Sequence, residues 1–72
     1  MIEYHRYRDH EIAIQLCAMS PGQFRWVWRI DGLHTSKSRN VLLAEEVARS
    51  EALMYAQLMI AKLEHALAIE AG

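Results

Sequence analysis

Residues 41–71 read VLLAEEVARSEALMYAQLMIAKLEHALAIEA, and this stretch decides the fold. It contains no proline and no glycine, and it is rich in alanine, leucine, glutamate and methionine, which are among the strongest helix formers. Glu45 and Glu46 near its start suit the positive end of a helix dipole, and Ser38 or Asn40 can cap the free N–H groups there. The sequence therefore predicts one long C-terminal helix over residues 41–71.

The predicted helix is longer than the sheet that the rest of the chain can form. At 1.5 Å per residue, residues 41–71 make a rod of roughly 46 Å. A strand of six or seven residues spans only about 20–24 Å. We therefore expect the N-terminal half of the helix to complete the core and its last turns to extend past the sheet.

The helix also carries two apolar stripes. One stripe contains Leu43, Val47, Met54, Leu58 and Ala61. The other has the alternating three- and four-residue spacing of a coiled-coil seam and contains Leu53, Ala56, Ile60, Leu63 and Leu67. A helix that is apolar on two sides has two partners, so the second stripe predicts a homodimer whose C-terminal helix halves pack antiparallel. The alternative is that one stripe consists of scattered exposed apolar residues, which are common on protein surfaces.

Strand patterns fill the chain ahead of the helix. Residues 10–19 alternate between strongly and weakly apolar side chains, and residues 24–30 alternate between apolar and mostly basic ones, as strands do. Pro21-Gly22 favours a tight turn between them. Asp31-Gly32 favours a second turn, after which residues 33–37 return as a short polar edge strand.

These elements predict the fold class and the domain organisation. The chain is expected to be an α+β protein with a single domain, residues 1–72. A three-stranded antiparallel meander over residues 3–38 packs against the one long helix, in the order β-β-β-α. A domain this small buries only about 60% of its unfolded surface, so assembly with a second copy is the expected source of extra buried area.

The aromatic face of the second predicted strand is the expected core. Phe24, Trp26, Trp28 and Ile30 lie on one side of that strand, and aromatic side chains of this size dominate the burial energy of small cores. The alternative is an aromatic platform for single-stranded nucleic acid. That arrangement requires the helix to cover the opposite face, which is less apolar, so we favour the core.

The opposite sheet face is basic. Residues 1–40 carry a net charge of +2 and residues 41–72 a net charge of -3, within a total of -1. The candidate nucleic-acid contacts on or beside this face are Arg25, Arg29, Lys37 and Arg39. So few positive charges predict weak binding to phosphates. The alternative is a solvated face whose charges are balanced by nearby acids.

The sequence gives little sign of catalysis, and no metal or cofactor is expected. Cys17 is the single cysteine, and the four histidines have no metal-binding spacing. The chain shows no recognisable catalytic frame and no glycine-rich phosphate loop. No apolar run approaches the ~20 residues of a membrane span, and the polar N-terminus is unlike a secretory signal. We expect a cytoplasmic protein without membrane contact.

The pattern of elements resembles small proteobacterial proteins of unknown function. The matching segments are Tyr7-Arg8-Asp9-His10-Glu11-Ile12, Gly22-Gln23-Phe24-Arg25-Trp26 and Glu45-Glu46-Val47-Ala48. The β-β-β-α order is also similar to part of HicB-like antitoxins and of double-stranded-RNA-binding domains. The chain lacks the acidic, glycine-punctuated strands of the former and the lysine-rich final helix of the latter. The resemblance implies a fold and brings no catalytic residues.

The expected function follows from these patterns. The sequence favours a non-enzymatic protein that acts through protein–protein interaction as a helix-mediated homodimer, with a further protein partner left unidentified. The alternative is a weak nucleic-acid-binding or toxin–antitoxin-type regulator that uses the basic sheet face.

Overall fold

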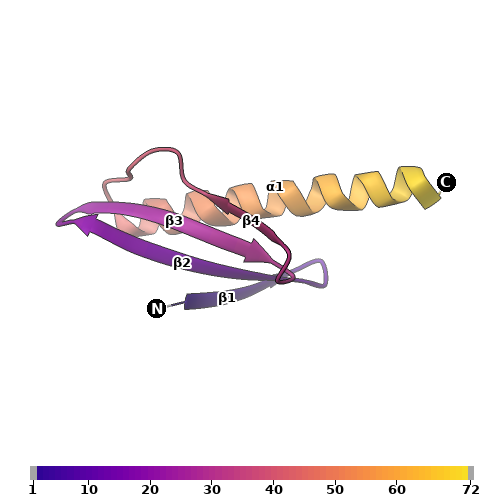
Figure 1. Cartoon of the computed structure of the whole chain (residues 1–72), viewed down its shortest axis with the longest axis horizontal. Coiled ribbons are helices and arrows are strands. Elements are labelled where there is room, and N and C mark those ends of the chain that lie inside the picture. The colour runs from indigo at the N-terminus through magenta and orange to yellow at the C-terminus, as the bar shows by residue number, and fades with distance from the viewer. Residues whose placement is uncertain (1, 72) are drawn as a thin grey trace.

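The computed structural model describes residues 2–71, with side chains as far as Ile69. Figure 1 shows a four-stranded antiparallel sheet and one long helix that lies across it. The elements are β1 (Ile2–Tyr7), β2 (His10–Ser20), β3 (Gln23–Ile30), β4 (His34–Lys37) and α1 (Glu45–Ala71), and the strands pair in sequence order. The predicted α+β fold, an antiparallel meander packed against a long C-terminal helix, is confirmed, with one further strand at the N-terminal edge.

The further strand, β1, arises from a hairpin turn that contains no glycine. Arg8 and Asp9 connect Tyr7 to His10, which pair directly across the hairpin. Both turn residues adopt positive φ, 49° and 65°, as the two central residues of a type I′ turn do. The predicted turn between β2 and β3 is confirmed, with Gly22 at a φ of 75°.

The core lies between β2, β3 and one face of α1. Its buried apolar residues are Ile12, Ile14, Trp26, Trp28, Ile30, Ala48, Ala52, Ala56 and Ile60. The sheet supplies most of the large side chains, whereas the helix supplies alanines at every fourth position, which lie on one face. These small residues let the helix backbone approach the tryptophans closely, as dense packing requires. The prediction that the helix covers the aromatic sheet face is confirmed.

The helix does not use its apolar stripes as predicted. Ala56 and Ile60 are fully buried in the chain's own core, so they are wrong as residues of a dimer interface. Leu53 is half-buried and packs against that core, Leu63 is half-buried, and Leu67 is largely exposed. The physical reason is size. Bulky tryptophans on the sheet require small partners on the helix, and Ala48, Ala52 and Ala56 provide them.

The helix begins at Glu45, four residues later than predicted. The backbone of Leu42 instead exchanges two hydrogen bonds of 2.8 Å with Phe24, which holds this segment against the start of β3. Ser38 does not cap the helix, because its buried hydroxyl accepts a hydrogen bond of 3.2 Å from the backbone N–H of Trp26. The connection between β4 and α1 is therefore fixed to the sheet.

The molecule is elongated, with extents of 49 × 20 × 17 Å. Its radius of gyration is 13.3 Å, whereas a compact domain of this length is expected to have about 11 Å. The cause is visible in Figure 1, where the C-terminal end of α1 extends beyond the sheet. Residues 65–69 are exposed on every side, so the helix has an overhang as its length predicts.

Length and composition alone would also allow α1 to cross a membrane. The segment Glu45–Ile69 meets these two criteria, and little of it is buried in the fold. One such helix is weak evidence, because core helices of soluble proteins have the same composition. In this fold the helix also carries charged residues along its length, and its alanine face packs on the sheet.

Candidate functional site

Three of the basic residues predicted to contact nucleic acid lie on the sheet face turned away from α1, here called the outer sheet face. Arg25 and Arg29 alternate with the core-facing tryptophans along β3. Lys37, on the neighbouring strand β4, pairs with Val27 of β3 and so lies on the same face as the two arginines. All three basic side chains are exposed. Among residues 2–69 none of them forms an ion pair, so their charges are available to solvent or to a ligand.

The fourth candidate, Arg39, extends this basic surface around the β4 edge. It follows β4 in the loop and is exposed. Arg25, Lys37 and Arg39 line one shallow hollow of about 630 Å³, together with Val27, Thr35, Ser36 and Ser38. Arg29 lies farther along the same face and does not border the hollow. The structure therefore brings three of the four predicted contacts together.

A second concavity, here called the side groove, lies between β4 and α1. Its volume is about 430 Å³, and it is lined by Trp26, Trp28, Ser36, Lys37, Arg39, Asn40, Glu51, Tyr55, Leu58, Met59 and Lys62. The helix packs mainly across β2 and β3, so the space beside β4 has to be filled by the side chains of β4 itself. Ser36 is too small to fill it, and the groove stays open.

Aromatic rings form the apolar part of the side groove. The rings of Trp26 and Trp28 are nearly parallel, with an interplanar angle of 5° and centroids 6.3 Å apart. The ring of Tyr55 on α1 stacks on Trp26 with centroids 5.9 Å apart. Both tryptophans are more than nine-tenths buried, so the groove has a rigid aromatic wall backed by the core.

The two indole N–H groups differ in their partners. The Trp26 Nε1–H donates a hydrogen bond of 3.0 Å to Glu51 on α1. The Trp28 Nε1 is buried and has no hydrogen-bond partner among the described residues. Most buried donors in proteins are paired, so Trp28 is an exception within a concave site. Sequence reasoning treated both residues as core and gave no signal of this difference.

The side of α1 that faces away from the sheet is apolar and exposed, and is here called the outer helix face. Its residues are Val47, Met54, Leu58 and Ala61. Met54 and Leu58 are 50% and 52% exposed in the isolated chain. Toward the C-terminus Ile69 is largely exposed near this side of the overhang, whereas the exposed Leu67 lies on the side that continues from Ala56 and Ile60. Met54, Leu58 and Ala61, which lie one helical turn apart, thus form an apolar strip along the rod.

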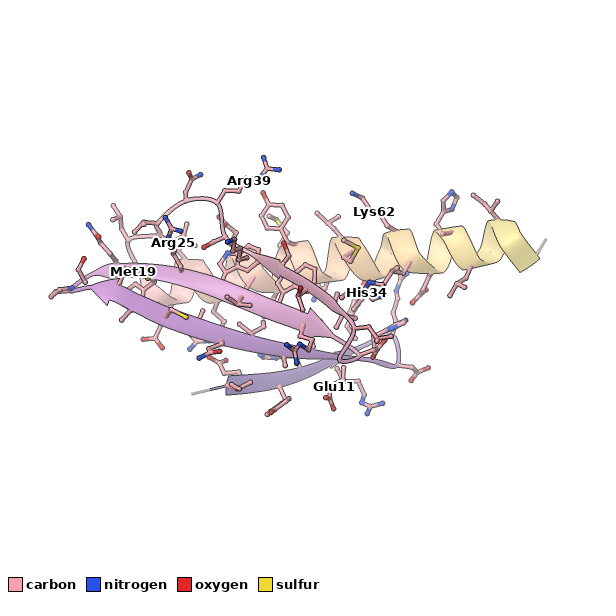
Figure 2. The ribbon with its side chains drawn as sticks, viewed as in Figure 1. Glu11, Met19, Arg25, His34, Arg39 and Lys62 are labelled. Carbon is pink, nitrogen blue, oxygen red and sulfur yellow. The ribbon has the colours of Figure 1, made fainter. Side chains whose placement is uncertain are left out.

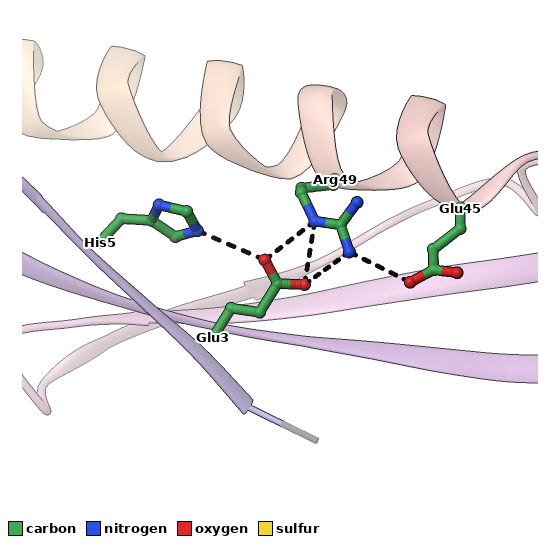
Figure 3. A network of polar contacts seen from close by, with 4 residues as sticks. All are labelled: Glu3, His5, Glu45 and Arg49. Atoms are coloured by element: carbon green, nitrogen blue, oxygen red, sulfur yellow. Dashed lines mark hydrogen bonds and ion pairs between the residues drawn. The ribbon is translucent and has the colours of Figure 1, made fainter.

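A polar network fixes β1 to the helix on the other side of the molecule (Figure 3). The Arg49 Nε donates to both carboxylate oxygens of Glu3 at 2.9 Å, and its Nη2 contacts Glu3 at 2.8 Å and Glu45 at 3.1 Å. His5 approaches Glu3 only to 3.6 Å, which is longer than a hydrogen bond. Donation from Arg49 holds the pKa of Glu3 below its ordinary value and raises that of Arg49.

A second network joins the β1–β2 and β3–β4 turns to the helix. Asp31 accepts a hydrogen bond from the backbone of Glu11 at 3.0 Å and contacts His10 Nδ1 at 2.6 Å. The contact with His10 and the backbone bond hold the pKa of Asp31 below its ordinary value. Glu64 on α1 lies 3.5 Å from Arg8 and 3.7 Å from His10. Both networks fasten edge elements to α1, and we assign them to the architecture of the fold.

Comparisons with protein-family models, curated proteins and solved structures find no significant match to this chain. The resemblance to small proteobacterial proteins therefore stays a prediction. The outer helix face, the outer sheet face and the side groove are the candidate sites of this fold.

Proposed function

We propose that the protein is a non-enzymatic interaction module that works as a homodimer, in which the outer helix faces of two copies pack together. The observation that supports this most directly is the exposed apolar strip on α1 and its overhang. Contiguous apolar patches of this kind mark interaction sites on soluble proteins. The interface differs from the one expected from the sequence, because Ala56 and Ile60 are already buried in the core between the helix and the sheet.

The total surface of the chain supports a second copy as the occupant. The folded chain exposes 5284 Å², whereas a folded monomer of 8.3 kDa is expected to expose about 4,600 Å². The excess of roughly 700 Å² is close to the ~800 Å² that each partner buries in a standard stable interface. Pairing along α1 would bring the exposed area into the normal range.

Charge and shape favour an antiparallel arrangement of the two helices. A parallel pair would place the acidic first turns, with Glu45 and Glu46, beside each other. An antiparallel pair centred near Met54 and Leu58 separates the two acidic first turns and sets the two helix dipoles in opposite directions. The same arrangement lays each overhang against the N-terminal half of the partner helix.

The proposal is tested by substituting the centre of the outer helix face. We expect Met54→Glu with Leu58→Glu to convert a dimer into a monomer at about 50 μM, because two charges would be buried in an apolar interface. Both side chains are half exposed in the isolated chain, so the fold should persist. Light scattering measures the mass, and circular dichroism checks the helix.

A matched control places the same charges elsewhere. Leu33→Glu with Leu43→Glu changes two residues that are each 79% exposed and lie outside α1, and this variant should remain dimeric. An unchanged mass in the Met54/Leu58 variant would contradict the proposed interface. A wild-type monomer that floats with vesicles of zwitterionic lipid would assign the same face to a membrane surface instead.

The basic outer sheet face supports a second candidate function, weak binding of nucleic acid. The specific observation is that Arg25, Lys37 and Arg39 line one hollow and that no ion pair within residues 2–69 neutralises them. Lysine and arginine side chains grouped in this way bind phosphates without reading the base sequence. Such binding would leave the outer helix face free for the dimer.

Salt-dependent gel shifts with DNA and RNA test this second candidate. At about 50 mM salt we expect measurable binding that weakens as the salt concentration rises. Arg25→Ala with Arg29→Ala should weaken it for all sequences and lower the salt slope by roughly 2. The control Arg8→Ala with Lys62→Ala removes two charges from other surfaces and should bind as wild type. Absence of binding, or binding that survives the Arg25/Arg29 change, would contradict this function.

A further inference from the structure

We propose that the side groove between β4 and α1 binds a small organic anion, a carboxylate joined to an apolar body. The groove combines three features that such a ligand requires. It has a wall of aromatic and aliphatic side chains, an excess of positive charge at its rim, and a buried hydrogen-bond donor without a partner. Each feature comes from a different part of the chain, and the groove shares Leu58 with the outer helix face of the proposed dimer.

The size and lining of the groove suit a small molecule. Its volume of about 430 Å³ falls within the range of about 300–1,000 Å³ that is usual for ligand sites. Trp26 and Tyr55 present stacked rings, and Leu58 and Met59 add flexible aliphatic surface from α1. An apolar body placed here would cover surface that β4 leaves open because Ser36 is small.

The charges at the rim select an anion. Lys37, Arg39 and Lys62 border the groove, and Glu51 is the one acidic residue among its lining residues. Glu51 already accepts a hydrogen bond from the indole N–H of Trp26. No ion pair within residues 2–69 involves any of the three cations. Figure 2 shows Arg39 and Lys62 on the same edge of the molecule, one from the loop after β4 and the other from α1. A carboxylate between them would gain charge-assisted hydrogen bonds.

The unpartnered indole N–H of Trp28 supplies a second, independent indication of a ligand. Trp28 lines the groove, is 98% buried, and keeps its Nε1 without an acceptor among the described residues. The Nε1 atom has almost no exposed surface, so an acceptor in the groove reaches it only when the lining side chains move on binding. A carboxylate oxygen would then satisfy this donor, whereas a purely apolar ligand would leave it unpaired. The donor therefore favours an acid over a hydrocarbon of the same shape.

Tryptophan fluorescence tests the proposal directly, because the chain has two tryptophans and both line the groove. The probe is octanoate, and octanamide is its neutral counterpart with the same chain length. We expect octanoate to change the fluorescence in a saturable way below about 1 mM, and octanamide to bind about tenfold more weakly. In a two-dimensional ¹H–¹⁵N spectrum the indole signal of Trp28 should shift more than that of Trp26.

Charge variants separate the groove from the rest of the basic surface. Arg39→Gln with Lys62→Gln should weaken octanoate binding by about tenfold or more and leave octanamide binding unchanged. The control Arg25→Gln with Arg29→Gln removes two charges from the outer sheet face and should bind octanoate as wild type. All four side chains are exposed, so both variants should fold. No saturable response, equal affinity for the two probes, or octanoate binding that survives the Arg39/Lys62 change would overturn the proposal.

Discussion

At the scale of single residues, Arg49 fixes the N-terminal edge strand to the helix. It donates to Glu3 across a sequence separation of 46 residues and also reaches Glu45 on its own helix. β1 is otherwise held by its pairing with β2 and by Tyr7, which packs against the core. The N-terminal strand and the first turns of α1 are thus joined by a contact that depends on the charge of one carboxylate.

This contact predicts a pH dependence of stability. The hydrogen bonds from Arg49 make the pKa of Glu3 lower in the folded chain than its ordinary value of 4.5. The ion pair therefore stabilises the fold above about pH 4.5, and its contribution is lost as the pH falls through the folded-state pKa. We expect Glu3→Gln to lower the melting temperature at about pH 7, and we expect its difference from wild type to narrow as the pH falls below 4.5.

Thermal unfolding followed by circular dichroism measures this difference. Glu11→Gln is the matched control, because Glu11 is exposed and none of the ion pairs among residues 2–69 includes it. The control should change stability little at either pH. A difference between Glu3→Gln and wild type that stays constant from pH 7 to pH 3 would show that the carboxylate charge is not the cause.

The alanines under the tryptophans give a second prediction at this scale. Ala56 is fully buried, so Ala56→Leu should overpack the core and destabilise the fold by about 1–3 kcal/mol. Ala66→Leu, on the exposed overhang, should stay within about 0.5 kcal/mol of wild type. Urea unfolding at one fixed chain concentration compares them, since dimerisation makes stability concentration-dependent. A tighter dimer without loss of stability in Ala56→Leu would place this residue in the interface after all.

At the scale of elements, the alternating residues of β3 and the helix-forming composition of α1 were sufficient to predict the fold. β1 was missed as a separate strand because its turn, Arg8-Asp9, carries no glycine or asparagine to mark it. Periodicity showed that α1 is apolar on two sides but did not show which side meets the sheet. Side-chain size carries that information, since large tryptophans on β3 pair with alanines on α1.

The side groove could not be predicted in the same way. It depends on where α1 crosses the sheet, which leaves the space beside β4 open. Its cations come from β4, from the following loop and from the distant Lys62 on α1. The missing partner of Trp28 also depends on this tertiary arrangement. Lys37 and Arg39 were named as contacts for nucleic acid, and the structure shows that they border the groove as well.

At the scale of the whole molecule, the chain exposes more surface than its mass requires. A long helix lies on a short sheet, so one half of the helix completes a core and the other extends as an overhang. The outer helix face and the overhang account for the dimer, while the outer sheet face remains open on each copy and the side groove borders the dimer interface at Leu58. A single small domain thus presents separate surfaces for a partner and for ligands.

Sedimentation equilibrium of the unmodified chain at about 50 μM determines whether two copies pair in solution. We predict a mass of twice 8.3 kDa, which falls toward 8.3 kDa on dilution. A mass of 8.3 kDa throughout that range would contradict the account, because the outer helix face would then have no second copy to cover it.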